Sequence, residues 1–116
     1  MKYVETIIRP NKYVETKEKL AEKGFYSAIV MDVIGRGKGD GKYKLVNGEE
    51  EYTTSMSYKA KKYIGMYLVD EDVEKVIEIL LSVNSTGSRG DGKIFVFDLE
   101  NAVRISTGIQ GEDAIV

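Results

Sequence analysis

The sequence predicts an α+β fold in which a strand-helix-strand unit occurs twice, with a long loop between the two units. Three observations support this expectation. Four segments have the apolar pattern of strands, two segments between them have helical periodicity, and one long glycine-rich stretch contains few apolar residues that could pack. Two such units side by side form a four-stranded antiparallel sheet with both helices on one face, which is the ferredoxin-like arrangement.

The first unit begins with a β-branched and aromatic run over residues 3–9. Pro10 ends this strand at its edge, and Asn11 is placed to cap a following helix. Residues 12–23 are rich in Lys, Glu, Leu and Ala, which favours a helix, and residues 25–34 return to a strand pattern. We therefore expect a strand, a helix and a second strand in this order.

The stretch 35–58 separates the two units. It carries five glycines and the acidic run 49–51. A connection of this length inside a small domain is usually functional. We interpret it as a protruding loop or an extended hairpin between the second and third strands.

The second unit begins with a strand pattern at 63–69. In residues 70–81 apolar side chains recur at i, i+3, i+4, i+7 and i+8, behind an acidic first turn that is expected to cap the helix. A fourth strand follows at 93–99, and we expect a short strand over 103–106 before a polar tail. One face of the resulting sheet has no helix to cover it, which favours an oligomer.

Length and composition limit the class of protein. The chain has 116 residues, 42% of them apolar and 31% charged, so we expect a single domain over residues 1–116. No apolar stretch approaches the ~18 residues of a membrane span, and the N-terminus lacks the apolar core of a signal peptide. These features predict a cytoplasmic protein that does not insert into membranes.

The chain contains neither cysteine nor histidine. This excludes thiol nucleophiles, disulfides and imidazole bases, and with them most hydrolase mechanisms and most zinc or iron sites. We therefore expect no catalytic residues, no protein-bound metal and no enzyme activity. A net charge of −2, with cations spread along the chain, gives no broad positive field for nucleic acid.

Residues 86–97 form a glycine-punctuated loop that runs directly into an alternating apolar strand. Bare backbone amides beside a cation suit an anionic ligand such as a phosphate group. A Gly-Asp-Gly sequence before a strand is also a common turn. The residue pattern alone leaves both interpretations open.

The residues that suggest two other functions have simpler explanations. Residues 93–97 faintly resemble the aromatic strand motif of RNA-recognition modules, but Phe95 and Phe97 share one strand face without a basic surround, so we expect them in the core. Small acyl-phosphate hydrolases of this fold place an arginine after the first strand, where this chain has Arg9 and Asn11. A strand end followed by a helix cap explains those two residues equally well.

The loop motif extends into a longer pattern. It resembles, at every defined position, the C-terminal signature of the PII signal-transduction family: Thr86-x-x-x-Gly90-Asp91-Gly92-Lys93-Ile94-Phe95-Val96-x-x-Leu99. Other matching segments are Ile7-Ile8-Arg9-Pro10 with Lys12, the pair Gly35-x-Gly37, Arg104-Ile105-x-Thr107-Gly108 and Asp113-Ala114-Ile115. The resemblance covers essentially the whole chain outside residues 39–60.

The resemblance implies a homotrimer that binds ATP or ADP in clefts between subunits, with Mg²⁺ and 2-oxoglutarate as further ligands in typical members. It implies a regulator of nitrogen metabolism that controls a target protein through the loop of residues 36–60. Such targets are nitrogen-metabolism enzymes, nitrogenase and ammonium transporters. By position, it assigns nucleotide binding to a set of loop, strand and tail residues: Ile7, Gly35, Gly37, Lys38, Lys61, Tyr67, Gly90, Asp91, Gly92, Lys93 and Arg104.

Departures from the family pattern leave the identity of the signal open. Gly39 replaces a glutamine that helps hold Mg²⁺ and 2-oxoglutarate beside ATP, so 2-oxoglutarate sensing is an open question. Ser106 replaces the second of two phosphate-binding arginines, and Lys38 stands where arginine is common. Weaker contacts to the terminal phosphate favour competition by ADP or AMP.

The loop between the units also departs from the pattern. Its tip is acidic, whereas typical members carry an arginine there that plugs ammonium channels, and Tyr52 is a candidate for the tyrosine that some bacterial members modify. Three alternatives therefore stand beside a general nitrogen regulator. They are a nitrogenase-regulating paralogue, a PII-like protein that senses AMP or ADP for another pathway, and, more remotely, a small ferredoxin-like phosphohydrolase.

Overall fold

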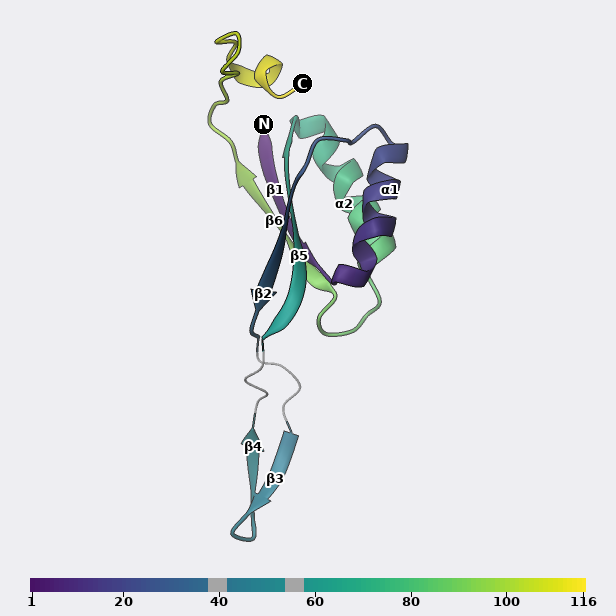
Figure 1. Cartoon of the computed structure of the whole chain (residues 1–116), viewed down its shortest axis with the longest axis vertical. Helices are drawn as coiled ribbons and strands as arrows, with labels where there is room; N and C mark the ends of the chain where they lie inside the picture. Colours follow the sequence, from purple (N-terminus) through teal and green to yellow (C-terminus); the bar gives the residue numbers. More distant parts are fainter. Residues whose placement is uncertain (38–41, 54–57) are drawn as a thin grey trace.

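Four strands form one antiparallel sheet, and two helices cover one of its faces (Figure 1). The structure is a computed structural model that describes residues 1–37, 42–53 and 58–116. The elements in chain order are β1 (Lys2–Ile8), η1 (Pro10–Lys12), α1 (Tyr13–Glu22), β2 (Ile29–Gly35), β3 (Lys42–Val46), β4 (Glu49–Thr53), β5 (Lys59–Leu68), α2 (Asp70–Asn84), β6 (Gly92–Asp98) and η2 (Gly111–Ala114).

The sheet has the strand order β2-β5-β1-β6. β1 pairs antiparallel with β5 on one side and with β6 on the other. This arrangement of two β-α-β units confirms the predicted ferredoxin-like α+β fold. Two strand boundaries differ from the predictions. β2 begins at Ile29 because Phe25 packs against the core beside α1, and β5 begins at Lys59 because it pairs with the whole length of β2.

The hydrophobic core lies between the sheet and the helices. β1 alternates strictly, so that Val4, Thr6 and Ile8 point to the helices and are buried. The other buried apolar residues come from β5 and both helices: Leu20, Ile64, Met66, Leu68, Val76, Leu80 and Val83. Burial of each large apolar side chain stabilises the fold by about 1.5–3 kcal/mol. The core therefore fixes the strand register that positions the loops at the ends of the sheet.

The opposite face of the sheet carries aromatic side chains. The ring of Tyr3 lies 4.9 Å from that of Tyr67 and 6.0 Å from that of Phe97. The prediction that Phe95 and Phe97 belong to the core is wrong for the single chain, since they are 41% and 48% exposed. They do share one face, but Ile94 pairs with the buried Thr6, so the aromatic face of β6 is the one without helices.

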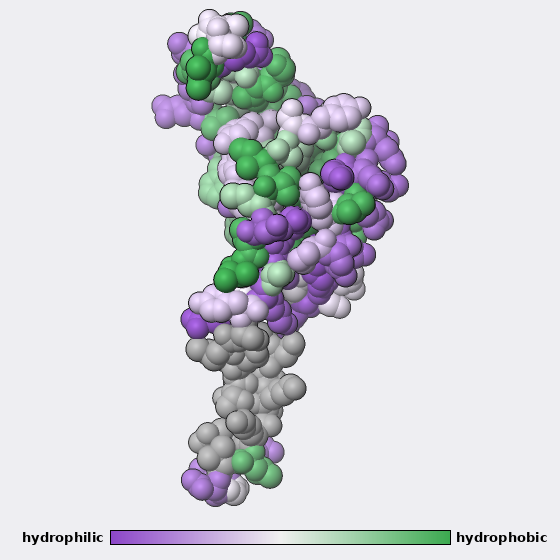
Figure 2. All heavy atoms as spheres, viewed as in Figure 1, coloured by the Kyte–Doolittle hydropathy of each residue, from purple (hydrophilic) through white to green (hydrophobic). Residues whose placement is uncertain are grey.

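A large part of this outer sheet face is apolar and exposed. In Figure 2 hydrophobic residues gather over the strands, whereas the helical side is mostly hydrophilic. The exposed apolar residues on β2 include Ile29 and Met31, each 47% exposed. The uncovered apolar face that the strand and helix order predicted is therefore present in the structure.

Gly65 lies beneath Tyr3 on this outer face. A Cβ atom at position 65 would lie 2.5 Å from the Tyr3 hydroxyl, so the tyrosine ring rests on the bare backbone of β5. The Tyr3 hydroxyl is also hydrogen-bonded to the Tyr63 hydroxyl. This hydrogen bond, together with burial, raises the pKa of Tyr63 above its ordinary value. Both tyrosines thus have fixed positions near the middle of the sheet.

The long connection between the two units contains a two-stranded hairpin, β3–β4, that projects from one end of the sheet (Figure 1). Asn47 and Gly48 form its turn with φ angles of 52° and 81°. Asn-Gly with both φ angles positive is typical of a type I′ turn, whose twist matches that of paired strands. Of the two interpretations of residues 35–58, the hairpin is confirmed for residues 42–53.

Neither helix has the expected side-chain cap. The N-terminal capping position of α1 is Lys12, and Asn11 lies inside η1 without capping it. The capping position of α2 is Val69, and the first-turn acids leave its cap unfilled. One of these acids, Asp70, instead accepts a hydrogen bond from the N-terminal ammonium group at 2.9 Å. α1 thus begins after the short turn η1, and α2 begins directly after the extended residue Val69 that follows β5.

The expected strand over 103–106 is wrong. Val103 makes a single bridge to Gln110, and the chain turns between these two residues. The amides of Thr107 and Gly108 both donate to the Arg104 carbonyl oxygen, at 3.3 and 2.7 Å, which closes the turn. Gly108 has a φ of 75°, which a strand would not allow.

Neither α1 nor α2, in the part of the chain that the structure describes, is long and apolar enough to cross a membrane.

Gly92 allows β6 to approach β1, and we predict that Gly92→Ala is strongly destabilising. A Cβ at this position would lie 1.8 Å from the Ile7 carbonyl oxygen, and the φ of Gly92 is 115°. Overpacking and left-handed backbone strain together should lower the free energy of unfolding by about 2–6 kcal/mol. Urea denaturation at fixed protein concentration measures this loss.

Gly24→Ala is the matched control for this substitution. Gly24 also has a positive φ, 89°, but nothing lies within 4 Å of an added Cβ. Its replacement should therefore cost only about 1–2 kcal/mol. Equal losses for the two variants would show that the contact with Ile7 is unimportant.

Candidate functional site

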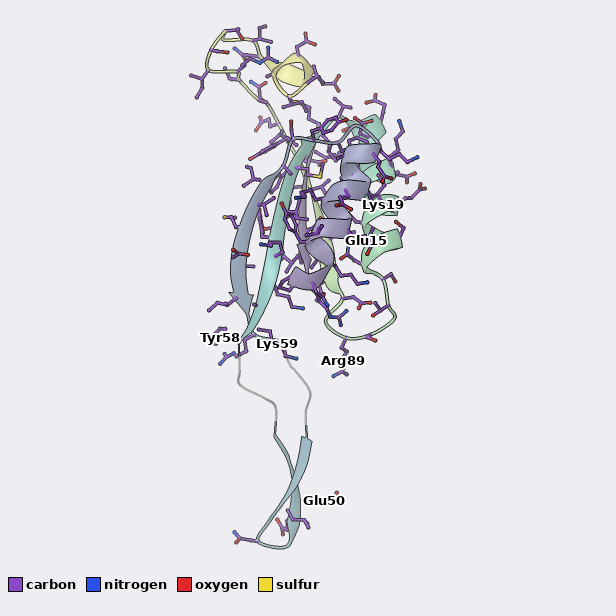
Figure 3. All side chains as sticks on the ribbon, turned by 45° about the vertical axis from the view of Figure 1, so that its right-hand side comes forward. Glu15, Lys19, Glu50, Tyr58, Lys59 and Arg89 are labelled. Atoms are coloured by element: carbon purple, nitrogen blue, oxygen red, sulfur yellow. The ribbon has the colours of Figure 1, made fainter. Side chains whose placement is uncertain are left out.

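The loop of residues 85–91 joins α2 to β6 at the same end of the sheet from which the hairpin projects (Figure 1). The first residue pair of β5 with β2, Lys59 with Gly35, lies at this end as well. Figure 3 shows Arg89 and Lys59 at this end, with Arg89 pointing away from the sheet. Residues from several distant parts of the sequence therefore meet around this loop.

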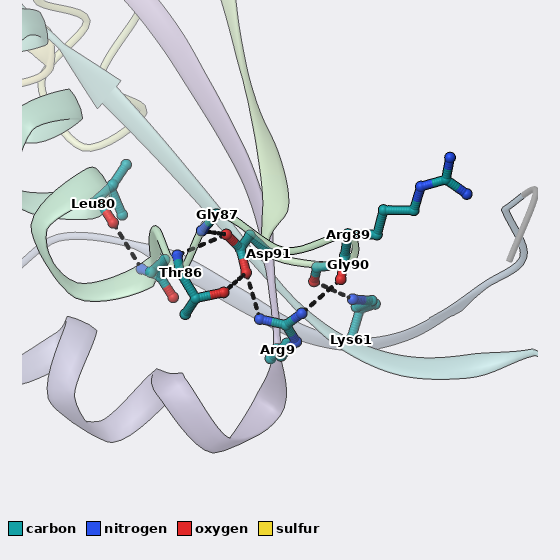
Figure 4. A network of polar contacts seen from close by, with 9 residues as sticks. Arg9, Lys61, Leu80, Thr86, Gly87, Arg89, Gly90 and Asp91 are labelled. Carbon is teal, nitrogen blue, oxygen red and sulfur yellow. Dashed lines mark hydrogen bonds and ion pairs between the residues drawn. The ribbon is translucent and has the colours of Figure 1, made fainter. Parts of the chain in front are cut away.

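The Asp91 carboxylate closes the loop on itself (Figure 4). Its Oδ2 accepts hydrogen bonds from the backbone amides of Thr86 and Gly87, at 2.7 and 3.0 Å. Its Oδ1 accepts a hydrogen bond from the Thr86 hydroxyl. These bonds from Thr86, with a further contribution from Arg9, hold the pKa of Asp91 well below its ordinary value. Asp91 is thus a structural clasp that remains ionised.

Arg9 extends from the end of β1 to two points on the loop. Its Nη1 lies 2.5 Å from Asp91 Oδ1, and its Nη2 donates to the Arg89 carbonyl oxygen at 2.7 Å. The expectation that a strand end and a helix cap explain Arg9 therefore missed its main contacts. One signal was available in the sequence: strand pairing of 7–8 with 92–93 would place residue 9 beside residue 91.

Lys61 contacts the loop from β5. Its ammonium group donates to the Gly90 carbonyl oxygen at 2.7 Å. Burial lowers the pKa of Lys61, and repulsion from Arg9 and Lys59 adds to this shift. Arg9 and Lys61 lie on one side of Gly90, since a Cβ there would be 3.2 Å from Arg9 Nη2 and 3.7 Å from Lys61 Nζ.

Three glycines with positive φ angles give the loop its path, the first of them Gly87 with a φ of 78°. Gly90 and Gly92 have φ angles of 89° and 115°, a region that other residues rarely adopt. Lys93 follows on β6 with an exposed side chain and pairs with Ile7 of β1. A loop of this kind presents backbone amides and a lysine ammonium group to an anion.

A cleft of about 350 Å³ borders the loop between α2, β1 and β6. Its walls are mainly apolar, and the loop residues close one side of it. It is lined by Thr6, Ile7, Ile8, Leu80, Leu81, Asn84, Ser85, Asp91, Gly92, Lys93 and Ile94. The anion-presenting residues therefore adjoin a recess with room for part of a small organic ligand.

The structure brings most of the predicted site residues together. Those at one end of the sheet are Ile7, Gly35, Lys61, Gly90, Asp91, Gly92 and Lys93, and Gly37 follows β2 there. Lys38, like Gly39, lies outside the described residues. The Asp91 carboxylate binds the loop and Arg9. The assignment of Asp91 to nucleotide binding stays a prediction.

Two predicted residues lie far from the loop within one chain. Tyr67 is six residues beyond Lys61 in β5, which corresponds to about 20 Å along a strand. Arg104 belongs to the C-terminal segment at the opposite end of the molecule from the hairpin (Figure 1). Its Nη2 donates to the carbonyl oxygens of Asp113 and Val116, both at 2.9 Å. Within one chain, Tyr67 and Arg104 therefore lie apart from the other predicted site residues.

The fold and the loop define a small ferredoxin-like domain that presents backbone amides and cations at one end of its sheet. Among the described residues, no group of acidic side chains is arranged to hold a metal ion. The backbone amides and cations of the described loop favour an anion as its ligand.

Comparison with known proteins agrees with a ferredoxin-like domain of this kind and identifies its family. The model of the family "Nitrogen regulatory protein P-II" matches residues 1–109. The chain is 43% identical over 122 residues to a "Nitrogen fixation nifHD region GlnB-like protein 2" of Methanobacterium ivanovii, with 100% of both chains covered. It is 44% identical over 115 residues to a nitrogen regulatory protein P-II of Rhodobacter capsulatus, covering 99% of this chain and 100% of the relative.

A solved structure shows the same fold. The crystal structure of Arabidopsis thaliana PII bound to citrate matches with a TM-score of 0.74 and 29% identity, covering 98% of this chain and 88% of that chain. The chain belongs to the PII family of nitrogen regulatory proteins. This confirms the resemblance found in the sequence. Members of this family are signalling regulators.

We predict that the Asp91 clasp makes stability depend on pH at the acid end. A carboxyl whose pKa is depressed in the folded state stabilises the fold above its unfolded-state value, here 3.8, and loses this contribution as pH falls towards the folded-state value. The melting temperature of the wild type should therefore fall more steeply from about pH 5 to about pH 2 than that of Asp91→Asn.

The control for the pH measurement is Glu78→Gln, which removes an exposed carboxylate on α2 outside the loop. Its melting curve should follow that of the wild type across the same pH range. Parallel curves for the wild type and Asp91→Asn would contradict the clasp.

Proposed function

We propose that this chain is a PII regulator of nitrogen metabolism that binds adenine nucleotides at the loop of residues 86–93. In this proposal nucleotide binding controls a target protein through the segment 36–60. The single observation that carries the proposal is the glycine loop that Asp91 closes on itself beside Arg9 and Lys61.

The residues of the loop fit a phosphate chain. Gly90 and Gly92 have the positive φ angles that bare backbone amides need to curve around an anion, and Lys93 supplies an exposed cation. Lys61 lies close enough to move from the Gly90 carbonyl oxygen to a phosphate oxygen. The adjacent cleft of about 350 Å³ offers space for further ligand atoms. These features support ATP or ADP as the ligand.

We further propose that the working unit is a homotrimer. The outer sheet face supports this, because Tyr67, Phe95 and Phe97 are 41% to 48% exposed in the single chain. Apolar faces of this kind are seldom left in water. Within one chain, Tyr67 and Arg104 lie far from the loop of residues 86–93. In a trimer, these two residues of one subunit would meet the loop of a neighbouring subunit.

The projecting hairpin supports a role in target recognition. It carries the exposed residues Leu45, Glu49 and Glu50 at its end, with Glu50 visible there in Figure 3. The relative from Methanobacterium ivanovii is described as a product of a nitrogen fixation region, and a similarly described relative of Methanosarcina barkeri is 36% identical over 126 residues. These relatives favour a nitrogenase-related target over an ammonium transporter.

The choice among ligands depends on residues that include Lys38, Gly39 and Ser106. Lys38 and Gly39 lie outside the described residues, so Mg²⁺ and 2-oxoglutarate binding remain proposals from the resemblance. Ser106 stands in the exposed turn that follows Arg104. With serine at this position, we propose that ADP and AMP compete well with ATP.

We predict that the purified protein binds ATP or ADP with a dissociation constant below about 1 mM. Lys93→Ala should weaken this binding about 10- to 100-fold, because it removes a charge-assisted contact to phosphate. Titration calorimetry measures both values, on material whose sedimentation mass is three times the 13.0 kDa chain mass.

Lys62→Ala provides the control for nucleotide binding. Lys62 is the neighbour of Lys61 in β5, but its ammonium group pairs with Asp32 at 2.5 Å instead of the loop. This variant should bind nucleotide like the wild type.

Absence of ATP, ADP and AMP binding at millimolar concentration would refute the proposed function. Steady phosphate release that Lys93→Ala abolishes would favour a phosphohydrolase, and salt-sensitive RNA binding that Phe95→Ala abolishes would favour an RNA-binding protein.

We also predict that capture of a target from the native cytosol depends on the nucleotide. The immobilised protein should retain a different partner set in ATP, in ADP, and in ATP with 2-oxoglutarate. Replacing residues 42–53 with a short Gly-Ser linker should abolish this capture while leaving ATP affinity unchanged, because the hairpin lies outside the loop of residues 86–93. Unchanged capture by that variant would contradict the role of the hairpin.

A further inference from the structure

Among the described residues, Arg9 is the side chain that contacts both the Asp91 carboxylate and the Arg89 carbonyl oxygen. Its Nη1 pairs with the Asp91 carboxylate at 2.5 Å, and its Nη2 binds the Arg89 carbonyl oxygen at 2.7 Å. Both partners belong to the loop that is proposed to bind phosphate (Figure 4). Neither side chain of the ion pair is freely solvated, since Arg9 is 29% and Asp91 is 20% exposed.

The first contact addresses an electrostatic problem in the loop. A carboxylate beside an anion-binding loop repels the anion that the loop is built to hold. The clasp needs this carboxylate, because Asp91 binds the amides of Thr86 and Gly87. Arg9 places a permanent positive charge against the same Oδ1 that accepts the Thr86 hydroxyl. The carboxylate can then shape the loop without repelling a phosphate at full strength.

The second contact sets the direction of a backbone amide. A peptide unit is planar and trans, so its C=O and N–H groups point in opposite directions. Because Arg9 Nη2 holds the Arg89 carbonyl oxygen, the Gly90 N–H is directed away from the guanidinium group. Lys61 holds the next carbonyl oxygen, that of Gly90, on the same side of the loop. The Gly90 N–H therefore points to the opposite side of the loop from Arg9 and Lys61.

We propose that Arg9 is a positioning residue of the loop of residues 86–93. Its guanidinium group neutralises the Asp91 carboxylate and turns the Arg89–Gly90 peptide so that the Gly90 N–H faces a bound phosphate. Arg9 itself does not contact the phosphate. This inference rests on the proposed function, because it assigns Arg9 a part in nucleotide binding.

The test compares ATP affinity in five proteins by titration calorimetry: the wild type, Arg9→Met, Arg9→Lys, the double variant Arg9→Met/Asp91→Asn and the control Lys62→Met. Arg9→Met should weaken ATP binding about 10- to 100-fold, because it leaves the carboxylate uncompensated and the peptide unfixed. Arg9→Lys keeps the charge with a single point of attachment, so it should recover part of the loss. Lys62→Met removes a nearby cation that pairs with Asp32 and should leave ATP binding unchanged.

The double variant separates the proposed role from simple support of the loop. If Arg9 compensates a repulsive charge, Arg9→Met/Asp91→Asn should bind ATP more tightly than Arg9→Met alone, since the second substitution removes the repulsion. If Arg9 only holds the loop together, the double variant should bind no better than Arg9→Met, and that result would overturn the proposal. Thermal melting of each variant shows whether the fold itself is intact.

The outcomes also distinguish this inference from the proposed function. A wild type that binds no nucleotide would refute both. A wild type that binds ATP, together with a folded Arg9→Met variant of equal affinity, would refute the role of Arg9 and leave the proposed function standing.

Discussion

The double pairing of β1 is the constraint on which the rest of the structure depends. β1 is hydrogen-bonded to β5 on one side and to β6 on the other, so its register fixes both neighbours. Its inward side chains Val4, Thr6 and Ile8 are buried under the helices, and a shift by one residue would exchange them with the outer face. The same register sets the Ile7 carbonyl oxygen against Gly92. The path of the loop before β6 is thus decided at the end of β1.

This constraint explains how the site is assembled from distant segments. Arg9 follows β1, Lys61 lies on β5, and Asp91 precedes β6, which are three adjacent strands of the sheet. Strand pairing brings these groups together. The loop is then held by one carboxylate that accepts hydrogen bonds from its own backbone and by the cations Arg9 and Lys61. The shape of the loop therefore depends on the pairing of β5, β1 and β6.

Periodicity was sufficient to predict most of the fold. Alternation and helical spacing identify the four sheet strands, both helices and their order, because a packed core requires those patterns. Local signals were weaker: Asn11 caps no helix because a short turn precedes α1, and residues 103–106 turn back at Gly108 instead of extending. The exposure of Phe95 was not predicted, because alternation shows which residues of a strand share a face but not which face the helices cover.

The candidate site was only partly predictable for a related reason. The glycines and Lys93 are recognisable because their residue types carry the chemistry of an anion loop. Arg9 was not among the predicted site residues, because its contacts with the loop depend on strand register, which the local sequence does not display. The contacts of the Asp91 carboxylate with Thr86, Gly87 and Arg9 were not predicted, because residue type alone does not show which groups a side chain contacts. Tyr67 and Arg104 lie outside the loop in one chain, so their assignment depends on assembly.

The aromatic outer face has a consequence for protein engineering that follows from Gly65. This glycine does not have a positive φ, so its use is the missing side chain that lets the Tyr3 ring lie flat against β5. Any larger residue at position 65 would lift that ring from the sheet, and Tyr67 and Phe97 contact the same ring. A single methyl group at this position would thus displace the outer face at Tyr3. Position 65 is accordingly the place at which to test whether the outer face takes part in the proposed association of chains.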